Sequence, residues 1–259
     1  MEITINEAIL QIKEKEISNS INQLESKQVG ERPIVDGIID TSKYLNSEFR
    51  ILWILREARE EWSINKETGK KNIGGWNLVN GLYKNASYDV ICNNTTTRRE
   101  LLVDYAIMNN IRYLDNNISK YSKIYTIEEK EKALEAFKST AVINIKKFPG
   151  KKTSSIPQIV ESFKLSKDIL ISQIDAYNPQ IVICGNTLPL FENELDFRIG
   201  IRFPLGMGKN GYYCLPNRIY INAYHPSNKF WPNSMYEHQY ISKIIEAVVN
   251  WKNNYYQKT

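Results

Sequence analysis

The second half of the chain alternates short apolar runs with amphipathic helical patterns, and this alternation limits the fold more than any other feature. The apolar runs at 141–145, 180–184 and 218–223 are rich in β-branched residues, as strands are. Residues 157–176 repeat apolar side chains at helical spacing. Residues 49–55 form a continuous apolar run, which is typical of a strand buried on both faces. Since strands separated by helices pair in parallel, we predict an α/β fold whose parallel sheet is covered on both faces.

Composition excludes several classes of protein. The chain has 259 residues, of which 42% are hydrophobic and 24% charged, so it can bury a sizeable core. It contains no apolar stretch of the roughly 18 residues that a membrane span needs. Its N-terminus lacks the basic and apolar regions of a signal peptide, so we expect a cytoplasmic protein with no membrane partner. The net charge of +5 favours polyanionic partners, nucleic acid among them.

Metals and nucleotide cofactors are not expected. Cys92, Cys184 and Cys214 are too few and too scattered for a closed zinc site or a disulfide framework. The segment 206–211 spells G-x-G-x-x-G, but it precedes a predicted strand and opens no helix, so it does not predict a dinucleotide site. The segment 149–153 is similar to a phosphate-binding loop, yet Ile145 stands where the first glycine belongs. We therefore predict no cofactor and no metal.

Polar residues follow each predicted strand. The carboxyl ends of parallel strands meet at one edge of the sheet, which is where ligands bind in open α/β folds. The residues at these ends are Arg56, Glu57 and Arg59, then Asn144, then Gly185 and Asn186, and finally His225 and Ser227. A buried asparagine must satisfy both its donor and its acceptor, and such a group can read the edge of a nucleobase. The sequence thus predicts a carboxylate, a carboxamide and a histidine at one edge.

The order and spelling of these motifs resemble the uracil-DNA glycosylase superfamily over about residues 48–250. The resemblance rests on Tyr-Asn-Pro-Gln-Ile-Val-Ile-Cys-Gly at 177–185 and on His-Pro-Ser at 225–227. The spelling is closest to the bacterial and archaeal family that carries an iron–sulfur cluster, whose cysteines this chain lacks. The resemblance implies a three-layer α/β/α sandwich around a four-stranded parallel sheet. Residues 1–47 would then be an N-terminal helical extension packed on the core, and residues 48–259 a glycosylase-like domain with a helical insertion at about 63–139.

The resemblance also implies roles for individual residues. Glu57 falls where the superfamily orients or activates water, and His225 where it stabilises the departing base. It implies base recognition by Asn144 and Trp76. We also expect Arg56 and Arg59 to contact the base, although the family has other residues at these two positions. Contact with DNA phosphates is expected of the loop after the second strand and of the His-Pro-Ser motif, at Lys146, Lys147, Lys151, Lys152, Thr153, Ser154 and Ser227.

These roles imply a monofunctional DNA glycosylase, which flips a base out of DNA and hydrolyses its N-glycosidic bond to leave an abasic site. Arg56 and Arg59 replace the glycine and the proline of the first motif of the family, which changes the size and charge of the pocket. We therefore expect a modified base, and the chain is similar to a branch that removes α-glucosyl-hydroxymethylcytosine from phage DNA as anti-phage defence. The nearer alternative is repair of uracil or another deaminated base.

Other interpretations stay open. A non-catalytic nucleic-acid-binding module on the same fold would bind DNA without releasing a base, and an enzyme of free nucleosides or nucleotides would act without DNA. Each residue also has a structural interpretation: His225 as a packing histidine, Glu57 as a helix N-terminal residue, Asn144 as a loop cap and Trp76 as core. The two arginines can form surface ion pairs, and the lysines can be solvated. No obligate protein partner is inferred.

Overall fold

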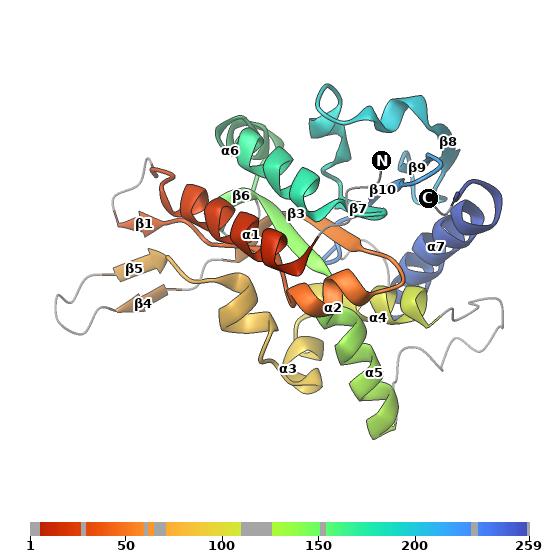
Figure 1. Cartoon of the computed structure of the whole chain (residues 1–259), viewed down its shortest axis with the longest axis horizontal. Coiled ribbons are helices and arrows are strands. Elements are labelled where there is room, and N and C mark those ends of the chain that lie inside the picture. Colours follow the sequence, from red (N-terminus) through yellow and green to blue (C-terminus); the bar gives the residue numbers. More distant parts are fainter. Residues whose placement is uncertain are drawn as a thin grey trace.

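The computed structural model describes residues 6–26, 30–59, 62–64, 71–109, 126–150, 154–228 and 233–257. The fold is mixed α/β with a mostly parallel central sheet (Figure 1). The sheet has seven strands, which in spatial order are β2 (Gly37–Ile38), β6 (Ala141–Gly150), β3 (Ile51–Arg59), β7 (Ile181–Gly185), β10 (Ile219–Ala223), β9 (Gly211–Cys214) and β8 (Ile201–Pro204). The expected sheet of four strands is therefore too small.

The extra strands lie at the two edges of the sheet. Neighbours among β6, β3, β7 and β10 pair in parallel, whereas β2, β9 and β8 join in antiparallel pairs. The sequence predicts a connection at 31–48, because of Pro33 and Gly37, and an irregular segment at 203–215, but the first contains β2 and the second contains β9 and the end of β8. Because an unpaired strand edge exposes main-chain groups, these short strands cover edges that the four central strands would leave open.

Helices cover both faces of the sheet and give the protein two hydrophobic cores. One core is formed against β6, β3, β7 and β10 by α1 (Glu7–Asn22), α2 (Thr41–Asn46) and α6 (Ile156–Tyr177). The other is formed by α3 (Tyr88–Cys92), α4 (Thr95–Met108), α5 (Ile127–Lys138) and α7 (Asn233–Asn254). Alternate residues of each strand enter opposite cores, as Leu52 and Trp53 do in β3.

A second, smaller sheet lies to one side of the main one (Figure 1). It contains β1 (Glu31–Arg32), β5 (Lys71–Gly74) and β4 (Trp62–Ile64) in that order. The segment 63–139, expected to be a helical insertion, therefore contributes strands as well as α3, α4, α5 and a π-helical turn at Val79–Tyr83. The periodicity of residues 76–86 predicts a full helix, but the structure forms only this turn and the residues beside it.

Helix α4 begins earlier than its sequence suggests. The Thr97–Glu100 spelling predicts a capping box at residue 97, but Asn94 caps the helix, accepting a hydrogen bond of 2.8 Å from the main-chain N–H of Thr96. Glu100 is fully buried, and this burial raises its pKa well above the usual range. Capping boxes form at the starts of α5, between Thr126 and Glu129, and of α6, between Ser155 and Gln158. None of the helices in the described ranges is long and apolar enough to cross a membrane.

Helix α1 is attached to the edge of the main sheet through Glu14. Its carboxyl group is partly buried and receives hydrogen bonds from the Tyr177 hydroxyl and from the main chain of Ile38. Gly37 makes this approach possible, because a Cβ atom there would lie 2.6 Å from the Tyr177 hydroxyl and 2.9 Å from Glu14 Oε2. Burial raises the pKa of Glu14 from 4.5 to about 7.

This raised pKa makes the stability of the protein depend on Glu14 near neutral pH. Between pH 4.5 and about 7 the native state keeps the proton that the unfolded chain has lost, so rising pH favours unfolding. The free energy of unfolding should therefore fall with rising pH in the wild type, and it should fall by about 2 kcal/mol less in Glu14→Gln. Urea unfolding at pH 4.5 and pH 8 measures the difference. Exposed Glu16 in the same helix provides the control, and curves for E14Q and wild type that stay parallel would contradict the prediction.

Candidate active site at the carboxyl edge of the sheet

The register of the central strands places the expected residues along one edge of the sheet. Asn144 of β6 lies opposite Leu55 of β3, and Lys146 lies opposite Glu57. His225 follows β10, two residues after Ala223, which pairs with Gly185 at the end of β7. Glu57 and Asn144 thus lie on the neighbouring strands β3 and β6. His225 follows β10, which lies two strand spacings, about 10 Å, from β3.

Strand β6 extends further along this edge than expected. Residues 146–155 were expected to form a loop after the strand, but β6 continues to Gly150 because β3 extends beside it as far as Arg59. The pairing shifts between Glu57 and Arg59, where the two strands no longer match residue for residue. Such an irregularity bends a strand and redirects its side chains.

Glu57 occupies a space made by a glycine. A Cβ atom on Gly150 would lie 2.4 Å from Glu57 Cγ, so only glycine leaves room for this side chain. The main-chain N–H of Ser154 donates a hydrogen bond of 3.2 Å to Glu57 Oε1. The second oxygen, Oε2, is buried and has no hydrogen-bond partner among the described residues. An unpaired buried oxygen is costly, so this atom is a candidate contact for water or a ligand.

His225 is held as a neutral ring with a defined proton position. The main-chain N–H of Ser227 donates to Nδ1 at 3.2 Å, and the Ser227 hydroxyl lies 2.8 Å from the same atom. A ring nitrogen that accepts a hydrogen bond carries no proton, so the proton of the neutral ring is on Nε2. Burial and the positive charge of Arg56 lower the pKa of His225 from 6.5 to about 4.

Helix α4 holds the loop that carries His225 in place. Arg99 of α4 is buried and donates hydrogen bonds to the main-chain carbonyls of Pro226 and Asn228, the latter at 3.1 Å. Gly185 leaves room for the His225 ring, because a Cβ atom at residue 185 would lie 3.3 Å from His225 Cδ2 and 3.3 Å from a methyl group of Leu55. The position of the ring is therefore set by several elements of the fold.

Asn144 is buried and tied to an aspartate. Its main-chain N–H donates a hydrogen bond of 2.8 Å to Asp36 Oδ2, and its side-chain Nδ2 lies 3.5 Å from the same oxygen. Lys147, expected to contact phosphate, does not do so: it is buried and forms an ion pair of 2.6 Å with Asp36 and a hydrogen bond of 2.8 Å to Gln173. That expectation is wrong because residue 147 lies within β6 and its side chain enters the core beside α6.

Trp76, Lys146 and Ser227 are further expected residues whose side chains the structure describes. Trp76 is partly buried and packs against the core on the α4 face, and its buried Nε1 has no hydrogen-bond partner among the described residues. Lys146 donates a hydrogen bond of 2.8 Å to the carbonyl of Pro149 in its own strand, and the Ser227 side chain is exposed. Lys151, Lys152 and Thr153 lie outside the described residues, as does the side chain of Arg59.

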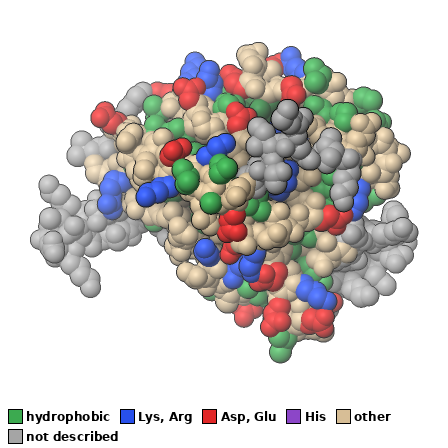
Figure 2. Space-filling model, viewed as in Figure 1, with side chains coloured by type: hydrophobic (Ala, Val, Ile, Leu, Met, Phe, Trp, Pro, Cys, Tyr) green, Lys and Arg blue, Asp and Glu red, His purple; other side chains and the backbone are tan. Residues whose placement is uncertain are grey.

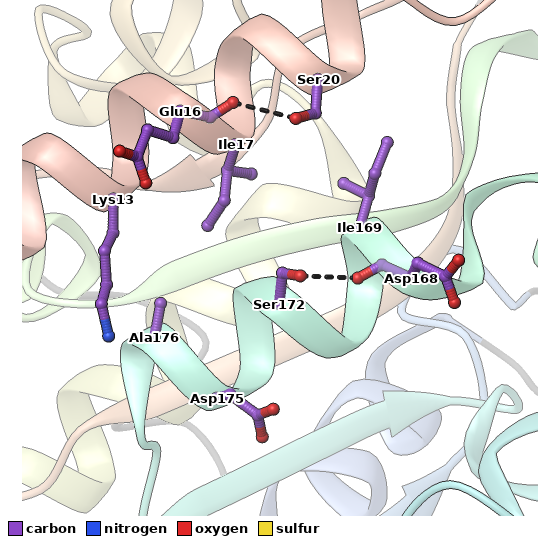
Figure 3. Close-up of a pocket in the computed structure, with 9 residues that line it drawn as sticks. All are labelled: Lys13, Glu16, Ile17, Ser20, Asp168, Ile169, Ser172, Asp175 and Ala176. Atoms are coloured by element: carbon purple, nitrogen blue, oxygen red, sulfur yellow. Dashed lines mark hydrogen bonds between the residues drawn. The ribbon is translucent and has the colours of Figure 1, made fainter.

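Within the described ranges, no group of three or more His, Cys, Asp or Glu side chains is arranged to hold a metal ion. A groove of about 520 Å³ lies elsewhere, between α1 and α6 (Figure 3). Glu16, Asp168 and Asp175 line it, and these carboxylates would repel a nucleic-acid backbone. On the face of the protein that carries these helices, acidic and basic side chains are interspersed (Figure 2). The described residues of this face form no continuous positive patch for DNA.

Sequence reasoning missed several residues that build the edge. Asp36 stands alone among the apolar residues of Ile34–Ile39, and Arg99 is followed by the buried carboxyl and apolar run of 100–103. A charge inside an apolar run is a signal for a paired, buried charge, and Asp36 showed it, whereas Arg99 stands between Arg98 and Glu100 and did not. Gly150 and Gly185 gave no such signal, because the side chains that need their space come from other strands.

Two comparisons with known proteins found no match to this chain. No protein-family model matches the chain, and a search of curated proteins finds no match. A proposal about function must therefore rest on the arrangement of Glu57, Asn144 and His225.

Proposed function

We propose that this protein is a DNA glycosylase that hydrolyses the N-glycosidic bond of a base flipped out of DNA. The observation that carries the proposal is the pair of unused polar atoms at the edge. Glu57 has a buried oxygen without a partner, and His225 has its proton on Nε2, for which no hydrogen bond is found among the described residues. Asn144 belongs to β6, the strand between β3 and the edge strand β2.

The chemistry follows from the charges that bond cleavage creates. When the bond between C1′ and the base nitrogen breaks, its electron pair leaves with the base and positive charge develops on the sugar. The Nε2–H group of neutral His225 donates a hydrogen bond to the departing base, and the Glu57 carboxylate stabilises the sugar cation. Glu57 also orients the water that attacks C1′, and it accepts the proton that this water loses.

Asn144 supplies recognition of the base in this proposal. Its amide offers one acceptor and one donor side by side, which matches the hydrogen-bonding edge of a pyrimidine. Arg56 adds a guanidinium group at the same strand end, partly exposed and close enough to His225 to lower its pKa. A cationic donor beside the pocket favours a base that carries extra oxygen groups, so we propose a modified base, such as α-glucosyl-hydroxymethylcytosine in phage DNA, over uracil.

Base release from defined DNA tests the proposal. The substrates are single-stranded and duplex oligonucleotides that contain uracil, cytosine, 5-hydroxymethylcytosine or its α-glucosyl derivative, and abasic sites are detected as strand breaks after alkali. We expect abasic sites in the glucosylated DNA. Release from uracil-containing DNA alone would favour the repair function. Salt-sensitive binding without abasic sites in any substrate would contradict a glycosylase and favour a binding module.

A further inference from the structure

Asp36 connects Asn144 to a buried polar network that the proposed chemistry does not use. Its carboxylate is 3% exposed. One oxygen, Oδ1, accepts hydrogen bonds from Lys147 Nζ at 2.6 Å and from Gln173 Nε2 at 3.0 Å. The other oxygen, Oδ2, accepts the main-chain N–H of Asn144 at 2.8 Å and faces the Asn144 side-chain nitrogen at 3.5 Å. The carboxylate therefore faces both the backbone and the amide of the proposed recognition residue.

We propose that Asp36 is a positioning residue that fixes the orientation of the Asn144 amide and thereby selects which bases the pocket accepts. The inference rests on the proposed function, in which Asn144 contacts the base. A carboxylate attracts the NH2 end of an amide and repels its carbonyl oxygen, so the Asn144 carbonyl is directed away from Asp36. The long side-chain contact suffices for this preference, because the effect is electrostatic and the group is buried.

The carboxylate can do this only because it is itself immobile. Lys147 neutralises its charge, and Gln173 of α6 binds both Oδ1 and the main-chain carbonyl of Asp36. Rotation of Asp36 would break these contacts and leave a buried ammonium group unpaired, which is strongly unfavourable. The lysine expected to hold phosphate thus holds the residue that orients the amide.

Amide orientation matters because it exchanges a donor for an acceptor. A cytosine-type base presents an exocyclic amino donor where a uracil-type base presents a carbonyl acceptor. A free asparagine turns by 180° and pairs with either base, whereas a fixed one pairs with a single type and leaves the other with unpaired buried groups. Asp36 would therefore exclude one of the two types of base even where both fit the pocket by shape.

The test replaces Asp36 by asparagine, which keeps the size of the side chain and can present either a donor or an acceptor to Asn144. Because D36N alone leaves Lys147 without a counter-charge, the variant Asp36→Asn with Lys147→Met is studied beside it. The control is Asp175→Asn, an exposed carboxylate on α6. We expect the ratio of kcat/KM between the preferred base and its amino or keto counterpart to fall about tenfold in both variants and to stay unchanged in D175N. An unchanged ratio in the variants would overturn the selection.

A second measurement does not depend on catalysis. The backbone and side-chain amide signals of Asn144 in ¹⁵N-labelled protein should shift in D36N/K147M and keep their positions in D175N. Unmoved Asn144 signals would overturn the inference whether or not the protein releases bases. Shifted signals in a protein that releases no base from any DNA would support the link between the two residues and contradict the glycosylase proposal alone.

Discussion

Glu57→Gln should lower the rate of base release from DNA by about 10³-fold, the largest effect expected of any single substitution at this edge. Glutamine has the shape of glutamate, and its carbonyl oxygen can still accept the Ser154 N–H that Glu57 accepts at 3.2 Å. What the variant loses is the negative charge at the buried oxygen Oε2, which in the proposed mechanism stabilises the sugar cation and accepts a proton from water. Single-turnover kinetics with enzyme in excess of DNA measure the chemical step.

The loss must appear in the chemical step and not in folding or binding. We expect E57Q to unfold at the temperature of the wild type within a few degrees and to bind DNA with an affinity within about threefold, since removing a carboxylate does not weaken phosphate contacts. The exposed Glu131 of α5 provides the matched control, and E131Q should behave as wild type. If E57Q releases the base at more than one tenth of the wild-type rate, the catalytic role of Glu57 is contradicted and its role is structural.

The larger elements of the fold could be predicted from the sequence because their periodic patterns are long or strongly apolar. The helix expected at 157–176 is confirmed as Ile156–Tyr177, and the strand expected at 218–223 as Ile219–Ala223. Strands β8 and β9 were missed because each has only four residues, and because β8 is largely exposed and mixes polar with apolar residues. Strand β9 forms by pairing with the free edge of β10, and β8 then pairs with β9, a long-range cause that no local pattern records.

The candidate site could likewise be predicted only in part. Reasoning from strand ends placed Glu57, Asn144 and His225 at one edge, and the register of the sheet places them there. The fate of Lys147 could not be predicted, because its side chain pairs with a carboxylate 111 residues away in the chain. Within an apparent loop, such a lysine is most simply read as solvated or bound to phosphate. Only the extension of β6 along β3 turns it into the core.

His225→Ala should lower the rate of base release by about 10²-fold, since it removes a single hydrogen-bond donor from the departing base. The variant should fold normally, because Arg99 holds the loop through main-chain carbonyls and not through the histidine ring. Release of a base that leaves easily should suffer less than release of one that leaves poorly, as expected for a group that stabilises the leaving base. An equal loss for all bases, or none, would contradict this role.

The pH dependence separates a neutral donor from an acid. A histidine that protonates the base must be charged, so its activity would fall as pH rises through the ordinary pKa of 6.5. His225 has its pKa lowered to about 4 by burial and by Arg56, so its ring is neutral at pH 5 and at pH 8 alike. We therefore expect the chemical step to show no inflection near pH 6.5 in the wild type. Arg56→Gln removes the nearby positive charge and should move the pKa of His225 upward, toward the ordinary value. An inflection near pH 6.5 that the wild type shows and H225A lacks would mean that the charged ring acts, and the proposed hydrogen-bond role of Nε2 would then be wrong.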